Sequence, residues 1–305
     1  MSSIDILISS VLAFIMTAVG LSLTKRHFLV LLSRPKSLFL GLGLQIIILP
    51  VLAFIVTSFW NLPPEFAVGV IILAACPGGM TSNFISFFMK ANTALAVSLT
   101  ICNSTITMLS VPFYVGLALT THLGETTSLS LPFWSAAGKI FLVVLVPVWI
   151  GITIRAYFPK TAVRLQRLLR GVSIILLGLL FLIKFFAPTE SGGSGITLHE
   201  IALILPVSLL INFLALSSGY TIARLFGRPV NDKVTLGVEV GIQNTNLAFL
   251  IAATLLGNDN LLKPALVYAM FSFFTALAYA SILKPGELKK AVFFWRREEG
   301  KQPES

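Results

Sequence analysis

The sequence predicts an all-α polytopic membrane protein, and three observations carry that prediction. Of its 305 residues, 56% are hydrophobic and only 11% are charged, whereas a typical soluble domain has about 25% charged residues. The mean hydropathy is +0.93. The apolar residues gather in runs of about 20, the length that crosses a bilayer as a helix. No long polar stretch remains that could form a large soluble domain.

Nine apolar runs are long enough to be transmembrane helices. They cover residues 4–24, 36–59, 65–89, 92–119, 132–154, 170–187, 198–224, 233–256 and 262–284. Residues 285–305 follow as a polar, basic tail, and the whole chain, 1–305, is expected to be a single transmembrane domain. Because nine is an odd number, the two termini are expected on opposite sides of the membrane.

The positive charges give the orientation. All but three of the 22 Lys and Arg residues lie on one side of the predicted spans, the exceptions being Lys139, Lys184 and Lys263. The positive-inside rule therefore predicts an outer N-terminus and a cytoplasmic C-terminus. The membrane is expected to be a bacterial inner (plasma) membrane. The membrane topology then explains the formal charge of +10. No basic domain remains that could bind nucleic acid. The Ser- and Gly-rich residues 189–195 are expected to be a flexible outer loop.

The third run contains the motif "CPGGMTSNFISFF", residues 76 to 88. Pro77 removes a backbone donor and two glycines follow it, so the helix should break there. Thr81, Ser82 and Asn83 place three polar side chains directly after the break. Irregular backbone at this depth is tolerated only where protein or a water-filled cavity satisfies it.

The eighth run contains a second polar motif, "GVEVGIQNTNLA", residues 237 to 248. It runs in the opposite direction to the third run and should also be interrupted near its centre. Two discontinuous, antiparallel helices indicate an inverted repeat with a binding site at the midplane. The first repeat would be residues 1–119 with four helices and the second 132–284 with five, a five-plus-five fold lacking its first helix.

Glu239 is the one acidic residue that the predicted spans place at mid-membrane. A charge there costs at least about 2.5 kcal/mol, which favours a functional role, although a protonated structural glutamate is the other interpretation. Gln45, Thr100 and Asn103 lie at similar depth, and interhelical hydrogen bonding would also explain them. Carboxylate, amide and hydroxyl oxygens are ligands for a hard cation such as sodium. Two sodium ions sharing one carboxylate would leave one positive charge, which an organic anion would balance.

The segments "ACPGGMTSN", "ALAVSLT" and "EVGIQNTNLA" resemble those of the bile acid:sodium symporter family. The resemblance covers nearly the whole chain. It implies core and panel domains, two crossing discontinuous helices in the core, and alternating access by movement of one domain against the other.

The resemblance also implies site residues. The first sodium site would use Ser82, Asn83, Thr100 and Glu239. The second would use Gln45, Glu239, Gln243 and the backbone carbonyls of Val240 and Ile242. Substrate contacts are expected near the crossing, at Met80, Thr81, Asn103, Asn244 and Asn246.

Two positions depart from the family pattern. Met80 stands where a threonine is common, which leaves the nature of the substrate open. Ala96 stands where the family has a serine, and this removes one hydroxyl ligand from the first sodium site. Ser98 lies about 200° around the helix from Ala96 and cannot simply replace that ligand. A weaker first sodium site is therefore expected.

The leading hypothesis is a sodium-coupled importer of an organic anion, either a bile acid-like steroid acid or a small hydroxy or keto acid such as pantoate. The alternative is a fold-related metalloid or proton-driven exporter with Cys76 as a soft ligand. An intramembrane serine enzyme would need a base near Ser82, and all three histidines fall in predicted loops, so no enzyme is expected. A receptor is a further alternative, but no signalling domain is attached. The expected partners are the anion, sodium and the lipid bilayer, with no other cofactor and no protein partner.

Overall fold

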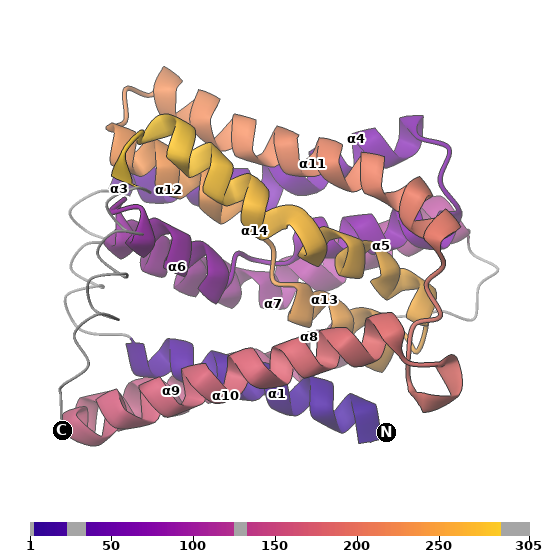
Figure 1. The fold of residues 1–305 in the computed structure, drawn as a ribbon, viewed down its shortest axis with the longest axis horizontal. Coiled ribbons are helices and arrows are strands. Elements are labelled where there is room, and N and C mark those ends of the chain that lie inside the picture. The colour runs from indigo at the N-terminus through magenta and orange to yellow at the C-terminus, as the bar shows by residue number, and fades with distance from the viewer. Residues whose placement is uncertain (1–2, 23–34, 125–132, 288–305) are drawn as a thin grey trace, which may run out of the picture.

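The computed structural model describes residues 3–22, 35–124 and 133–287, and within these ranges the chain is helical without strands. The helices run roughly parallel to one long axis and form two layers (Figure 1). One layer contains α1 (Ser3–Ser22), α9 (Val146–Tyr157) and α10 (Pro159–Phe186), and α1 packs against both of the others. Most of the remaining elements form the other layer. The basic residues Lys25, Arg26 and Arg34 and most of the tail lie outside the described residues.

The larger layer is built from the other described helices. These are α3 (Pro35–Gly43), α4 (Leu49–Phe59), α5 (Pro64–Ala75), α6 (Met80–Phe88), α7 (Thr93–Leu123), α11 (Leu198–Leu225), α12 (Val230–Gly241), α13 (Thr245–Phe249) and α14 (Lys263–Leu283). The helix α8 (Phe133–Ile140) leads into α9 through the π-helical turn Phe141–Leu145. Two further π-helical turns occur, Leu44–Ile48 between α3 and α4 and Leu250–Leu255 after α13.

Five helical segments in the described ranges are long and apolar enough to cross a membrane. They are Pro35–Phe59, Gly138–Tyr157, Pro159–Phe186, Leu198–Leu225 and Asp259–Leu283. A sixth is obtained if α7, which bends by 57° between Thr93–Thr107 and Leu109–Leu123, counts as one span. The predicted runs 4–24, 65–89 and 233–256 coincide with shorter or interrupted helices. The structure thus establishes a polytopic membrane protein, while the number nine stays a prediction.

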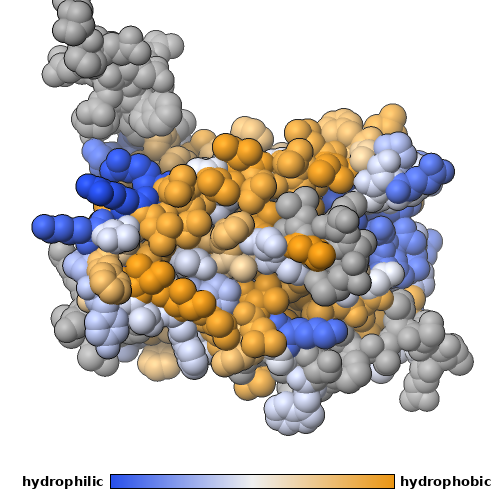
Figure 2. Space-filling view, turned by 90° about the horizontal axis from the view of Figure 1, so that it is seen from below, coloured by the Kyte–Doolittle hydropathy of each residue, from blue (hydrophilic) through white to orange (hydrophobic). Residues whose placement is uncertain are grey.

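The surface has the polarity that a bilayer requires. A broad apolar region lies between two polar ends of the long axis (Figure 2). Large apolar side chains are exposed on the described helices, among them Phe39 (70%), Ile175 (71%) and Phe274 (67%). In water such a surface would drive aggregation, whereas lipid tails solvate it at no cost.

Proline explains the π-helical turn before α4. Pro50 has no N–H, so the carbonyl of Ile46, four residues earlier, loses its helical donor. The Tyr114 hydroxyl of α7 donates to that carbonyl instead, at 2.8 Å. The wide turn Leu44–Ile48 lies directly before this point, and it contains Gln45, which is 1% exposed. Single π turns inside α-helices often mark functional positions.

One expectation about helix limits was wrong in part. The predicted run 170–187 begins too late, because α10 continues back to Pro159 through a polar first half that apolar content alone does not reveal. Residues 189–195, expected to be a flexible outer loop, contain a hydrogen-bonded turn. The Ser194 N–H donates to the Lys184 carbonyl at 2.8 Å, and Gly192 adopts a φ of 87°, which glycine enters without strain.

Candidate functional site

Both polar motifs interrupt their helices, and the two interruptions touch. The first break, Cys76–Gly79, separates α5 from α6, and the second break, Ile242–Asn244, separates α12 from α13. The backbone N–H of Asn244 donates to the carbonyl of Pro77 at 2.8 Å. A hydrogen bond between main-chain atoms therefore links the two breaks directly.

In the first break, a side chain from another segment satisfies one of the freed carbonyls. The Gln45 amide donates to the Cys76 carbonyl at 2.7 Å. The Ser82 hydroxyl lies 2.7 Å from the Gly79 carbonyl. Gly78 must be glycine for a spatial reason, because a Cβ there would lie 2.6 Å from Glu239 Oε1 and 3.0 Å from the Glu239 carbonyl oxygen. The first break thus closes directly over Glu239.

The four residues predicted for the first sodium site lie together, three of them around the carboxylate of the fourth, Glu239, which is 1% exposed. The hydroxyl of Ser82 on α6 donates to Oε2 at 2.7 Å. The hydroxyl of Thr100 on α7 donates to Oε1 at 2.7 Å. The Asn83 amide then donates to the Thr100 oxygen at 3.1 Å. Two helices, α6 and α7, therefore bring polar side chains to one buried carboxylate on a third, α12.

This cluster has more acceptor oxygens than hydrogens. A hydroxyl carries one hydrogen, yet Ser82 lies at 2.7 Å from both Gly79 O and Glu239 Oε2. Thr100 is similarly within 3.1 Å of the Ala96 carbonyl and 2.7 Å of Glu239 Oε1. The Asn83 Oδ1 atom is buried and no described group donates to it. Such an oxygen-rich environment suits a hard cation.

The residues predicted for the second sodium site are brought together only in part. The Gln45 amide donates to Gln243 Oε1 at 2.8 Å, and the Gln243 amide donates to the Val240 carbonyl at 2.5 Å. Gln45 Oε1 is buried without a donor among the described groups. Ile242 follows at the break, and its N–H donates to the Val238 carbonyl at 3.1 Å. Within the described chain the Glu239 carboxylate bonds to Ser82 and Thr100 and not to either glutamine.

The predicted substrate contacts are spread over three segments. Asn103 is fully buried on α7, and neither its Nδ2 nor its Oδ1 has a partner among the described groups. Asn246 is 5% exposed and its Oδ1 is also without one. Asn244 caps α13 by accepting from the Leu247 N–H at 3.1 Å. Thr81 is exposed at the start of α6, whereas the side chain of Met80 lies outside the described residues. Buried polar atoms without partners are costly, so Asn103 and Asn246 are the strongest of these candidates.

Two participants were missed by the sequence analysis. Asn212 on α11 and Tyr268 on α14 both donate to the Gly241 carbonyl at 2.8 Å, where α12 ends. Asn212 could have been noticed as an amide inside the apolar run 198–224. Tyr268 carries no such signal, because nothing in the sequence distinguishes it from a tyrosine at the lipid surface.

Cys76 occupies a different environment from the one that the exporter alternative needs. Its side chain is 0% exposed and belongs to the main hydrophobic cluster, while its carbonyl accepts from Gln45. A soft ligand for a transported metalloid would have to face a cavity. The structure therefore gives this alternative no support.

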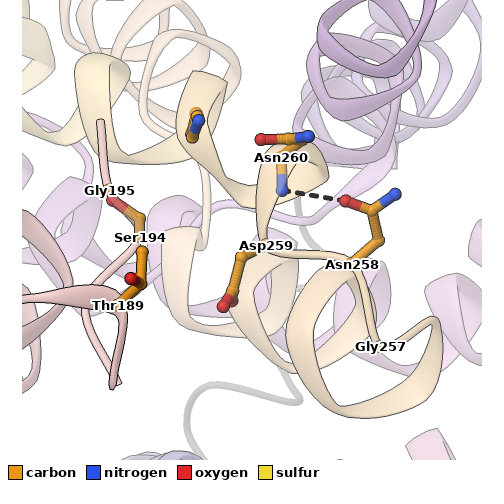
Figure 3. A pocket seen from close by; sticks show the side chains of 8 residues that line it. Thr189, Ser194, Gly195, Gly257, Asn258, Asp259 and Asn260 are labelled. Atoms are coloured by element: carbon orange, nitrogen blue, oxygen red, sulfur yellow. Dashed lines mark hydrogen bonds between the residues drawn. The ribbon is translucent and has the colours of Figure 1, made fainter. Parts of the chain in front are cut away.

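A separate polar cavity of about 550 Å³ lies near the start of α14 (Figure 3). Its lining comes from Thr189, Ser194, Gly195, Gly257, Asn258, Asp259, Asn260 and Lys263. Beside it, the Lys184 ammonium on α10 pairs with Asp259 at 2.9 Å, and Lys263 pairs with Glu200 on α11 at 2.7 Å. None of the predicted sodium or substrate residues lines this cavity. The Lys184–Asp259 pair joins the α1–α9–α10 layer to the rest of the molecule.

Comparison with known proteins identifies the family of the chain. The model of the sodium bile acid symporter family matches residues 9–191. The probable chloroplastic sodium/metabolite cotransporter BASS1 of Arabidopsis thaliana is 28% identical over 96% of this chain and 67% of its own length. The uncharacterized sodium-dependent transporter YocS of Bacillus subtilis (strain 168) is 30% identical over 79% of this chain and 72% of its own. The ileal sodium/bile acid cotransporter of Homo sapiens is 27% identical over 96% and 84%. With its family model matched over more than half of its length, the chain belongs to the sodium bile acid symporter family.

Proposed function

We propose that the protein is a sodium-coupled symporter that imports an organic anion by alternating access. One observation carries the proposal. The buried Glu239 carboxylate lies where three helices and the first break converge, and the oxygens around it outnumber the hydrogens available to them. Sodium would supply the missing positive charge without needing a hydrogen.

The first sodium ion would be held by Ser82, Asn83, Thr100 and Glu239. The second would use Gln45, Gln243 and the carbonyls of Val240 and Ile242, with Glu239 contributing charge. Two cations around one carboxylate leave one net positive charge. That charge, together with the N-terminus of α6, favours an anionic substrate beside the crossing. The candidate contacts are Met80, Thr81, Asn103, Asn244 and Asn246.

The substrate class follows from the relatives only in broad terms. Their names refer to bile acid and to metabolites. Steroid acids of the bile acid type and small hydroxy or keto acids such as pantoate are therefore the two groups to screen first.

Alternating access would use the two layers of Figure 1. The α1–α9–α10 layer, with α8, would be the panel and the remaining helices the core, in a nine-span inverted repeat. Residues 1–119 and 132–284 would be the two repeats, with 285–305 as a tail. The N-terminus would lie outside and the C-terminus in the cytoplasm of a bacterial inner membrane.

The test is a thermal-shift and uptake assay on the purified full chain, in sodium and in potassium at equal ionic strength. Taurocholate, pantoate and a panel of related acids are added in each salt. Sodium is expected to raise Tm and to enable uptake, and Glu239→Ala is expected to abolish both effects. Glu190→Ala, in the exposed turn at Thr189–Ser191, is the matched control and should behave as wild type.

Uptake that is indifferent to sodium, or unaffected by Glu239→Ala, would contradict the proposal. The exporter alternative makes opposite predictions, since it requires Cys76→Ser to abolish transport and sodium to have no effect.

A further inference from the structure

At the end of α12, two backbone carbonyls lack the N–H donors that a continuous helix would provide, because those N–H groups donate to other acceptors. In a continuous helix the Asn244 N–H would donate to Val240 O and the Thr245 N–H to Gly241 O. Instead, Asn244 donates to Pro77 O at 2.8 Å and Thr245 donates to Gln243 O at 3.0 Å. Both carbonyls therefore need a new partner or a cation.

The two carbonyls receive different numbers of hydrogen bonds. Val240 O receives one hydrogen bond, from its neighbour Gln243. Gly241 O receives two, from Asn212 Nδ2 and from the Tyr268 hydroxyl, each at 2.8 Å. A carbonyl oxygen has two lone pairs, so Gly241 O is fully occupied and cannot also bind a cation.

The group that occupies Gly241 O is closed and buried. Asn212 and Tyr268 are each 1% exposed, and the second hydrogen of the Asn212 amide goes to the Tyr268 oxygen at 2.9 Å. Every hydrogen of the three-residue network thus has an acceptor. A Cβ at Gly241 would overlap Leu216 Cδ2, so α12 packs closely against α11 at this point.

We infer that Asn212 and Tyr268 are positioning residues for the second sodium site. By fixing Gly241 O away from the ion, they set the directions of the adjoining peptide groups, including the Val240 and Ile242 carbonyls, and the place of Gln243. This inference rests on the proposed function. Neither residue touches the ion, so each acts through the backbone at Gly241.

The helix α14 supplies a matched pair of variants. Tyr279, three turns after Tyr268, also donates its hydroxyl to an α12 carbonyl at 2.8 Å, but at the opposite end, at Lys233. Tyr268→Phe and Tyr279→Phe each remove one hydroxyl and one bond from α14 to α12, and both keep the ring. A purely structural role predicts the same outcome for both.

The measurement is the sodium concentration that gives half of the maximal rise in Tm, with potassium as the balancing salt and the full chain in detergent. Tyr268→Phe is expected to raise that concentration by about three- to tenfold, since one net hydrogen bond is worth roughly that factor. Tyr279→Phe is expected to lower Tm in both salts and leave the half-saturating concentration unchanged. Asn212→Leu, which removes the other donor, should raise it at least as much as Tyr268→Phe and serves as the second variant.

Equal sodium dependence in Tyr268→Phe, Tyr279→Phe and wild type would overturn the inference while leaving the proposed function standing. A wild-type protein with no response to sodium would overturn both. A shift in Tyr268→Phe and Asn212→Leu alone supports the positioning role.

Discussion

The two breaks reach the same place by different means. The first break contains Pro77, Gly78 and Gly79, so its local sequence forbids a continuous helix. The second break contains no proline, and residues 242–244 include no glycine. It is stabilised by hydrogen bonds that replace those of a continuous helix. Asn212 and Tyr268 donate to the Gly241 carbonyl, and Gln243 donates to the Val240 carbonyl. The Pro77 carbonyl accepts from the N–H that follows Gln243. A helix can therefore be interrupted either because its own residues cannot continue it or because groups outside it replace its backbone hydrogen bonds.

This difference predicts different sensitivities. The first break should keep its conformation when side chains outside it are removed, and lose it when its own backbone is altered. The second should be disrupted when Asn212 or Tyr268, side chains distant in the sequence, is removed. Three further substitutions test the first break and the Glu239 cluster beneath it, from the largest expected effect to the smallest.

Gly78→Ala should have the largest effect. The added Cβ would lie 2.6 Å from Glu239 Oε1 and 3.0 Å from the Glu239 carbonyl, and overpacking of this kind costs about 1–3 kcal/mol. Because the clash falls on the carboxylate, sodium-dependent uptake should drop by tenfold or more. Gly79→Ala is the control, since its Cβ would meet no atom within 4 Å. Equal loss in both variants would show that the break needs glycine for flexibility and not for the approach to Glu239.

Thr100→Val should have an intermediate effect. It keeps the side-chain shape but removes the hydroxyl that donates to Glu239 and accepts from Asn83. A hydrogen bond to a charged group contributes about 1.5–3 kcal/mol, so the half-saturating sodium concentration should rise by about tenfold or more. Thr105→Val on the same helix is the control, because that hydroxyl bonds only to its own helix at Ile101 O. A Thr100→Val protein with normal sodium titration would remove Thr100 from the site.

Ala96→Ser should have the smallest effect, and it should be a gain. Ala96 lies one turn before Thr100, is fully buried, and already offers its carbonyl to the Thr100 hydroxyl. A serine there would add one oxygen beside the Glu239 cluster and lower the half-saturating sodium concentration by a few-fold. Sodium titration of Tm measures it. An unchanged or raised value would mean that this oxygen does not reach the ion.

The sequence alone predicted the parts of the molecule that are locally determined. Pro77, Gly78 and Gly79 predicted the first break, and the apolar runs predicted the helices. The position of Glu239 predicted a polar centre, and the structure places the Ser82 and Thr100 hydroxyls on its carboxylate. What could not be predicted depends on contacts between segments. No pattern shows that Tyr268 lies level with Gly241, that Tyr114 replaces the donor that Pro50 lacks, or that Cys76 points into the apolar cluster.

The hydrogen bond between Asn244 N–H and Pro77 O affects how the contact between the two breaks can change in evolution. Both atoms belong to the main chain, so exchanging either side chain leaves the bond intact, and only proline at 244 would delete it. The crossing point is thus insulated from most point mutations, and side chains around it can be replaced to suit a new substrate. Slow hydrogen exchange at the Asn244 amide would be the physical mark of that insulation.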